Sequence, residues 1–226
     1  MEHTSQHFER GLQRLREQLL RMGGLVEDRL QKAATALMDR REDLAAFVVG
    51  ADGEVNELQI QIDELCLRLL ALQHPVASDL RMVTSAIKIN ADLERMADQA
   101  VNIAQSTERL LRVPPLRPLL STPRMFELAE GMVRDALDAF VRQDVNLAQQ
   151  VLERDDEVDT LRDQSFRVLL THMLADPSTI ERALGLILIG RNLERVADHA
   201  TNIAEDVIFI VEARDIRHAR PGEAGR

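Results

Sequence analysis

Two pairs of acidic residues are the side chains in this sequence best placed to do chemistry. Glu94 and Asp98 are four residues apart, and so are Glu194 and Asp198. On a helix, side chains at this spacing share one face, with Cβ atoms roughly 5–6 Å apart. Because two negative charges at that distance repel each other, each pair indicates a partner that neutralises it.

Further acidic residues follow the same spacing earlier in each half of the chain. Asp155 and Asp159 form another pair, and Asp52 and Asn56 form its weaker counterpart, with one charge fewer. Carboxylate and amide oxygens are the ligands that hard cations such as iron, manganese, magnesium and calcium prefer. One interpretation of these pairs is therefore a cation-binding site in each half.

The alternative is a solvated acidic face that arginines neutralise in part; the candidates are Arg95, Arg191 and Arg195. A single pair favours this alternative, because such pairs are common on helix surfaces. Repetition in both halves supports a cation site about as well as a solvated acidic face. His199 directly follows Asp198, and neighbours on a helix point in different directions. We therefore expect His199 at the surface rather than as a ligand.

No familiar catalytic motif accompanies these carboxylates. The sequence lacks the Glu-x-x-His pattern of ferritin-like bundles, a P-loop, a dinucleotide fingerprint and a nucleophile elbow. Cys66, the only cysteine, lies in an apolar run and is expected to be a buried structural thiol. Met82 and Met96 fall at the spacing of core residues. Because no catalytic motif is present, we expect that the protein is not an enzyme.

An internal repeat places the acidic residues at matched positions. Residues 92–104 match residues 192–204 without a gap at an offset of 100, and residues 52–58 match residues 155–161 at an offset of 103. A duplication of this kind indicates two copies of one structural unit.

Each copy is predicted to form three helices, because apolar residues recur at three- and four-residue steps. The first three cover approximately residues 6–38, 43–72 and 75–111. Short connections between successive helices favour antiparallel neighbours. We predict an all-α fold of two tandem three-helix bundles, related by either a pseudo-twofold axis or a translation.

Prolines and glycines set the predicted boundaries. Residues 112–123 are proline-rich, Asp176 before Pro177 predicts a helix start, and Gly23–Gly24 is a candidate weak point in the first helix. The predicted units are a first bundle over residues 1–112, a linker over 113–123, a second bundle over 124–217 and a frayed tail over 218–226.

Composition narrows the class of protein. The chain has 226 residues, no Trp and no Tyr, so its core is expected to consist of aliphatic residues. Its net charge of −10 argues against nucleic-acid binding, which gathers positive charge. No apolar run approaches the length that spans a bilayer, and we expect a cytoplasmic protein that meets the membrane only through partners.

Several motifs together resemble the PhoU family. They are Gln73–Arg81, the doubled acidic motif at Leu93–Ala100 and Leu193–Ala200, and the ending Asn202–Val211. The resemblance covers almost the whole chain. It implies two three-helix bundles, often in a homodimer. It also implies a negative regulator of the phosphate-starvation response and of phosphate uptake. Such a regulator acts as an adaptor between the ATPase subunit of the phosphate ABC transporter and a sensor histidine kinase.

The resemblance also implies multinuclear metal sites, with iron or zinc in some members and manganese or magnesium as alternatives. The implied ligand sets are Glu94 and Asp98 with Asp52 and Asn56, and Glu194 and Asp198 with Asp155 and Asp159. Two other functions stay open. One is a carboxylate-bridged metalloenzyme, for which no base, nucleophile or substrate pocket is evident, and the other is a metal-free helical scaffold.

Overall fold

The computed structural model describes residues 2–73, 77–116 and 121–217, and these residues form helices and no strand. The helices are α1 (Glu2–Met38), α2 (Glu42–Gly50), α3 (Asp52–Gln73), α4 (Ala77–Leu111), α5 (Thr122–Arg142), α6 (Val145–Ala175), the short 3-10 helix η1 (Pro177–Thr179) and α7 (Ile180–Glu212). The predicted all-α fold is confirmed. Residues 117–120 of the predicted linker, the predicted tail and the break at Pro75 lie outside the described residues.

One predicted helix, over residues 43–72, is wrong as a single element, because it is interrupted at Ala51. α2 and α3 meet there, and the guanidinium group of Arg29 on α1 donates a hydrogen bond to the Ala51 carbonyl. Gly50 and Gly53 flank the break, and glycine weakens a helix interior. The matching helix of the second half, α6, continues without interruption.

Side chains and backbone mark the helix ends in the second half. α5 ends at Arg142, and the next residue, Gln143, has a left-handed φ of 53°. The carboxylate of Asp144 then accepts a hydrogen bond from the Leu147 N–H at 3.1 Å and caps α6. The Asp176 carboxylate accepts from the Ser178 N–H at 3.0 Å, which confirms the predicted helix start at that residue.

The expected weak point at Gly23–Gly24 is wrong, since α1 runs through both glycines. A Cβ atom on Gly23 would clash with Cδ1 of Leu137 on α5. Gly23 is therefore where helices from the two halves approach closely, whereas a Cβ atom on Gly24 would meet nothing within 4 Å.

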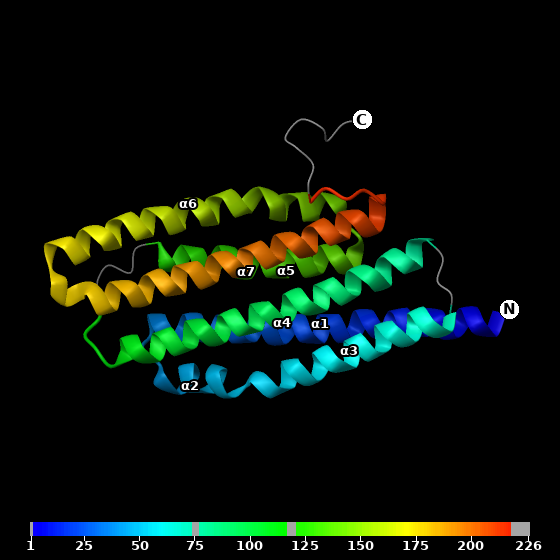
Figure 1. Cartoon of the computed structure of the whole chain (residues 1–226), viewed down its shortest axis with the longest axis horizontal. Helices are drawn as coiled ribbons and strands as arrows, with labels where there is room; N and C mark the ends of the chain where they lie inside the picture. The colour runs from blue at the N-terminus through cyan, green and yellow to red at the C-terminus, as the bar shows by residue number, and fades with distance from the viewer. Residues whose placement is uncertain (1, 74–76, 117–120, 218–226) are drawn as a thin grey trace.

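The two halves pack side by side, with all the long helices aligned along the molecule (Figure 1). α4 and α7 run antiparallel, because Arg81 contacts the carbonyl of Ile210 at 3.3 Å whereas Asp92 contacts Asn202 at 3.2 Å. Equivalent helices that pack antiparallel are related by a pseudo-twofold axis. The structure therefore chooses this alternative over the translation.

A continuous apolar core, mostly aliphatic but including Phe8, Phe126 and Phe140, joins both halves. Cys66, Met82 and Met96 are buried within it, as predicted from the sequence. None of the helices in the described part of the chain combines the length and the apolar character that a membrane crossing needs.

Candidate functional site

The carboxylates of the second half gather between α6 and α7. Asp155 and Asp159 lie on α6, and Glu194 and Asp198 lie on α7; we call these four residues the second acidic cluster. Their charges act on one another, because Asp198 and Asp159 both raise the pKa of Asp155. The structure thus brings together the four residues that the resemblance implied for this half.

An arginine neutralises part of this cluster. Nη1 of Arg162 on α6 lies 2.6 Å from Oε1 of Glu194 and 3.0 Å from Oδ1 of Asp159. Nη2 of the same side chain lies 2.9 Å from Oδ1 of Asp163. Arg162 is therefore an internal counter-ion that connects the two helices. Sequence reasoning proposed other arginines, although the spacing of three residues between Asp159 and Arg162 could have indicated this one.

Burial and mutual repulsion raise the pKa values in the cluster. Burial is the largest cause for Asp155, whose pKa rises to about 6, followed by the charges of Asp198 and Asp159. The pKa of Glu194 is raised by burial and by Asp198, while Arg162 opposes the shift. Burial and Asp159 likewise raise the pKa of Asp198. Asp155, Glu194 and Asp198 consequently hold protons more tightly than isolated carboxylates do.

The corresponding face of the first half is built differently. Glu94 is half-buried and Asp98 is exposed on α4, as Glu194 and Asp198 are on α7, but the half-buried Asn56 on α3 stands where the second half has Asp159. The side chain of Asp52 lies outside the described residues. The position equivalent to Arg162 is Gln59, so a neutral side chain stands where the second half has an arginine.

The chemistry of the donors fits a hard cation, because the second acidic cluster offers oxygen atoms only. Zinc fits less well, since its protein sites usually include nitrogen or sulfur. Within the described residues, no three acidic, histidine or cysteine side chains are arranged to hold a metal ion. Arg162 already lies between Glu194 and Asp159. The metal sites therefore stay a prediction.

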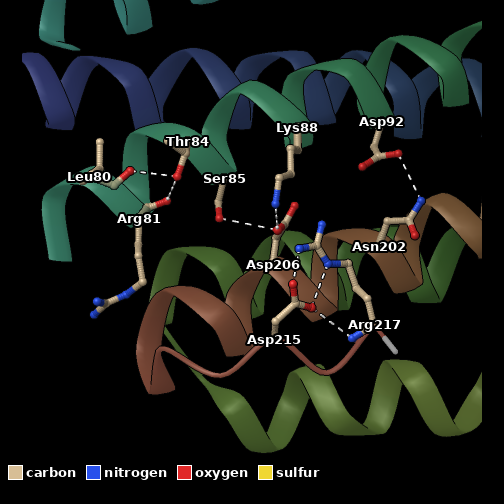
Figure 2. Close-up of polar contacts among 10 residues, drawn as sticks. All are labelled: Leu80, Arg81, Thr84, Ser85, Lys88, Asp92, Asn202, Asp206, Asp215 and Arg217. Atoms are coloured by element: carbon tan, nitrogen blue, oxygen red, sulfur yellow. Dashed lines mark hydrogen bonds and ion pairs between the residues drawn. The ribbon is translucent and has the colours of Figure 1, made fainter. Parts of the chain in front are cut away.

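A second polar region, which sequence reasoning missed, lies along the seam between α4 and α7 (Figure 2). Nζ of Lys88 lies 3.0 Å from Oδ1 of Asp206, whose side chain is only 4% exposed. Ser85 Oγ lies 3.5 Å from the same oxygen. Burial raises the pKa of Asp206, and Lys88 opposes that shift. Lys88 is one of only two lysines in the chain, which is the signal that could have drawn attention to it.

The seam continues one turn further with a buried aspartate. Oδ1 of Asp92 accepts hydrogen bonds from Nδ1 of His199 at 2.9 Å and from Nδ2 of Asn202 at 3.2 Å. The expectation of a surface histidine is therefore wrong, because the His199 side chain is only 15% exposed. A pocket of about 320 Å³ opens beside these groups, with Arg95 and Arg217 on its wall.

The pseudo-twofold axis relates this polar end of the seam to a mostly apolar end. The equivalents of Lys88 and Asp206 are Leu188 and Ser106, which line one pocket of about 270 Å³ at the opposite end. The same backbone arrangement therefore holds an ion pair at one end and mostly apolar side chains at the other.

Comparison with known proteins assigns the chain to a family. The PhoU domain model matches residues 19–107 and again residues 122–207. The phosphate-specific transport system accessory protein PhoU homolog of Pseudomonas putida is 42% identical over 217 residues, covering 96% of this chain and 85% of the relative. The homolog of Aquifex aeolicus is 40% identical, covering 95% and 97%.

Solved structures agree with the sequence relatives. The crystal structure of PhoU from Pseudomonas aeruginosa matches with a TM-score of 0.89 and 40% identity, covering 92% of this chain and 100% of that chain. The phosphate transport system regulatory protein PhoU from Streptococcus pneumoniae matches with a TM-score of 0.85 and 29% identity, covering 92% and 98%. This chain belongs to the PhoU family.

Proposed function

We propose that this protein is a negative regulator of phosphate uptake and of the phosphate-starvation response. It acts as an adaptor between the ATPase subunit of a phosphate ABC transporter and a sensor histidine kinase. The observation that carries the proposal is the match over nearly the whole chain to relatives named as accessory proteins of phosphate transport. We propose a binding role rather than catalysis, since the relatives are named as accessory proteins of phosphate transport and not as enzymes.

Deleting the gene in the organism that encodes it tests the regulatory role. With ample phosphate, we expect starvation genes to be derepressed and phosphate uptake to rise, and we expect the intact gene to reverse both changes. Normal repression in the deletion strain, and in a strain that also lacks any paralogue, would contradict the proposal.

The second acidic cluster is the face that we propose for partner or cation binding. Interacting carboxylates with raised pKa values, as at Asp155, Glu194 and Asp198, mark functional sites more often than ordinary surface positions do. The first half is the weaker candidate because Asn56 replaces a carboxylate and Gln59 replaces the arginine.

We further propose that Asp155, Asp159, Glu194 and Asp198 hold a metal ion, iron before zinc, when Arg162 turns away. When bound, such an ion would supply local positive charge. Metal content of the purified protein, measured by mass spectrometry, tests this. We expect Arg162→Gln to raise the metal content and Glu194→Gln to lower it. Equal metal content in both variants and the unaltered protein would count against the site.

The partners and the assembly state follow from the same family and are proposals too. We propose a cytoplasmic homodimer that reaches the membrane only through the transporter and the kinase. Light scattering of the purified protein measures the dimer. Binding of the purified ATPase subunit and of the kinase's cytoplasmic part, measured separately, tests the adaptor role, and binding to neither would refute it.

A further inference from the structure

A pocket of about 370 Å³ opens between α6 and α7 beyond the second acidic cluster. Its walls are part apolar and part charged. The residues that line it are Arg162, Asp163, Ser165, Phe166, Leu186, Ile187, Gly190, Arg191 and Glu194. This volume lies within the range of roughly 300–1,000 Å³ that is usual for small-molecule sites.

In the first half, a side chain fills the equivalent position between α3 and α4. The residue equivalent to Gly190 is Asn90, which is 1% exposed. Its Nδ2 donates hydrogen bonds across to α3, to the Gln59 carbonyl at 3.0 Å and to Oδ1 of Asp63 at 2.9 Å. Glycine at position 190 has no side chain to make these contacts. The pocket therefore exists where the second repeat lacks the side chain that bridges the helices in the first.

Ser165 gives the pocket a polar group that lacks a partner. The residue is 9% exposed, and its Oγ atom has no hydrogen-bond partner in the described part of the chain. A buried hydroxyl without a partner destabilises the folded protein. The equivalent residue in the first half is Ile62, which is fully buried and has no such need. A ligand with a hydrogen-bond acceptor would satisfy Ser165.

The charges on the wall define the ligand further. Arg162 is already paired with Glu194 and Asp163. Arg191 is exposed and makes neither a hydrogen bond nor an ion pair with any residue that the structure describes. One unpaired guanidinium balances one negative charge, and its planar fork matches a carboxylate. A dianion such as phosphate would meet stronger repulsion from the two wall carboxylates.

We infer that this pocket binds a small organic acid with one carboxylate and an apolar body. The carboxylate pairs with Arg191 and accepts the Ser165 hydroxyl proton in a hydrogen bond. The apolar body lies against Phe166, Ile187 and the bare backbone at Gly190.

Hydrocinnamate, a phenyl ring on a short chain that ends in a carboxylate, is a suitable probe. Its binding is followed through the methyl resonances of Ile187 in a protein-observed NMR titration. We expect a saturable shift, with a dissociation constant at least about fivefold lower than that of hydrocinnamyl alcohol, which lacks the charge. An Ile187 resonance that does not shift at about 10 mM acid, which corresponds to less than about 3 kcal/mol of binding, would overturn the inference.

Substitutions taken from the first half locate the site. Gly190→Asn and Ser165→Ile each install the side chain that closes the first half, and each should weaken binding at least about tenfold. Gly190→Ala is the matched control, because its Cβ atom would only contact Met125 at 3.9 Å. Melting curves verify that each variant is folded. Unchanged affinity in both folded closing variants would place the acid elsewhere and refute the site.

Arginine variants test the proposed charge pairing. Arg191→Gln should weaken binding about fivefold, whereas Arg195→Gln, one turn along the same helix, should leave it unchanged. Equal loss in the two variants would indicate a general effect of surface charge and would contradict the pairing with Arg191.

Discussion

The two halves of this protein share one backbone plan but differ in the side chains that connect their helices. In the second half Arg162 joins α6 to α7 through Asp159 and Glu194. In the first half Asn90 joins α4 to α3 through hydrogen bonds to the Gln59 carbonyl and the Asp63 carboxylate. The difference shows that the apolar core preserved the duplicated fold while the polar contacts between helices diverged.

The seam between α4 and α7 shows the same divergence within one interface. Its polar end contains the ion pair of the partly exposed Lys88 with the buried Asp206, and the equivalent end contains Leu188 and Ser106. Because a pseudo-twofold axis relates the two ends, each end provides the natural replacement residues for the other. Exchanges between the ends are therefore the most direct tests of this comparison.

The largest effect is expected at the polar end of the seam. Lys88→Leu leaves the Asp206 carboxylate buried without its cation and should lower the free energy of unfolding by about 3 kcal/mol. Adding Asp206→Ser recreates the apolar end and should recover most of that loss. Urea denaturation of both single variants and the double variant measures the coupling. A double variant that is no more stable than Lys88→Leu would break the proposed equivalence of the ends.

An intermediate effect is expected at Gly23, where α1 packs closely against α5 of the other half. Gly23→Ala places a Cβ atom against Leu137 and should destabilise the protein by about 2 kcal/mol. Gly24→Ala, the neighbouring control, meets no atom within 4 Å. It should stabilise α1 by about 0.5–1 kcal/mol. Thermal unfolding compares the two, and similar melting temperatures would show that the halves do not depend on this contact.

The smallest effect concerns the second acidic cluster. The pKa of Asp155 is raised in the folded chain, so its protonated form favours folding. That contribution is complete below about pH 4 and is lost as the pH rises through about 6. Asp155→Asn should therefore add stability near pH 7 and nothing near pH 4. The gain near pH 7 should be only about 1 kcal/mol, because solvent screens the charge at this half-exposed position. Asp156→Asn is the control. A gain of equal size at both pH values would contradict this explanation.

Much of the fold could be predicted from the sequence, because helix periodicity and the repeat are local patterns. The buried positions of Cys66 and Met96 followed from their apolar neighbours in the same way. The break at Ala51 was missed, since it depends in part on Arg29 from another helix. The sequence alone does not decide the relation between the halves, because that relation depends on contacts between α4 and α7, which are far apart in the chain.

The candidate site was predicted less completely than the fold. Spacing identified the acidic residues, and the structure brings the four of the second half together. Residue spacing did not identify Arg162 as their counter-ion or His199 as the partner of Asp92, because both pairings join residues on different helices. The pocket at Gly190 was also missed, since a missing side chain matters only when the neighbouring helix is known.

Repression of starvation genes in ample phosphate tests the central claim most directly. The deletion strain would carry the intact gene, Glu194→Gln with Asp198→Asn, or the matched first-half variant Glu94→Gln with Asp98→Asn. We predict full repression by the intact gene, a large loss in the second-half variant and a smaller loss in the first-half variant. Repression without any copy of the gene would contradict the regulatory role. A larger loss in the first-half variant would contradict the primacy of the second acidic cluster.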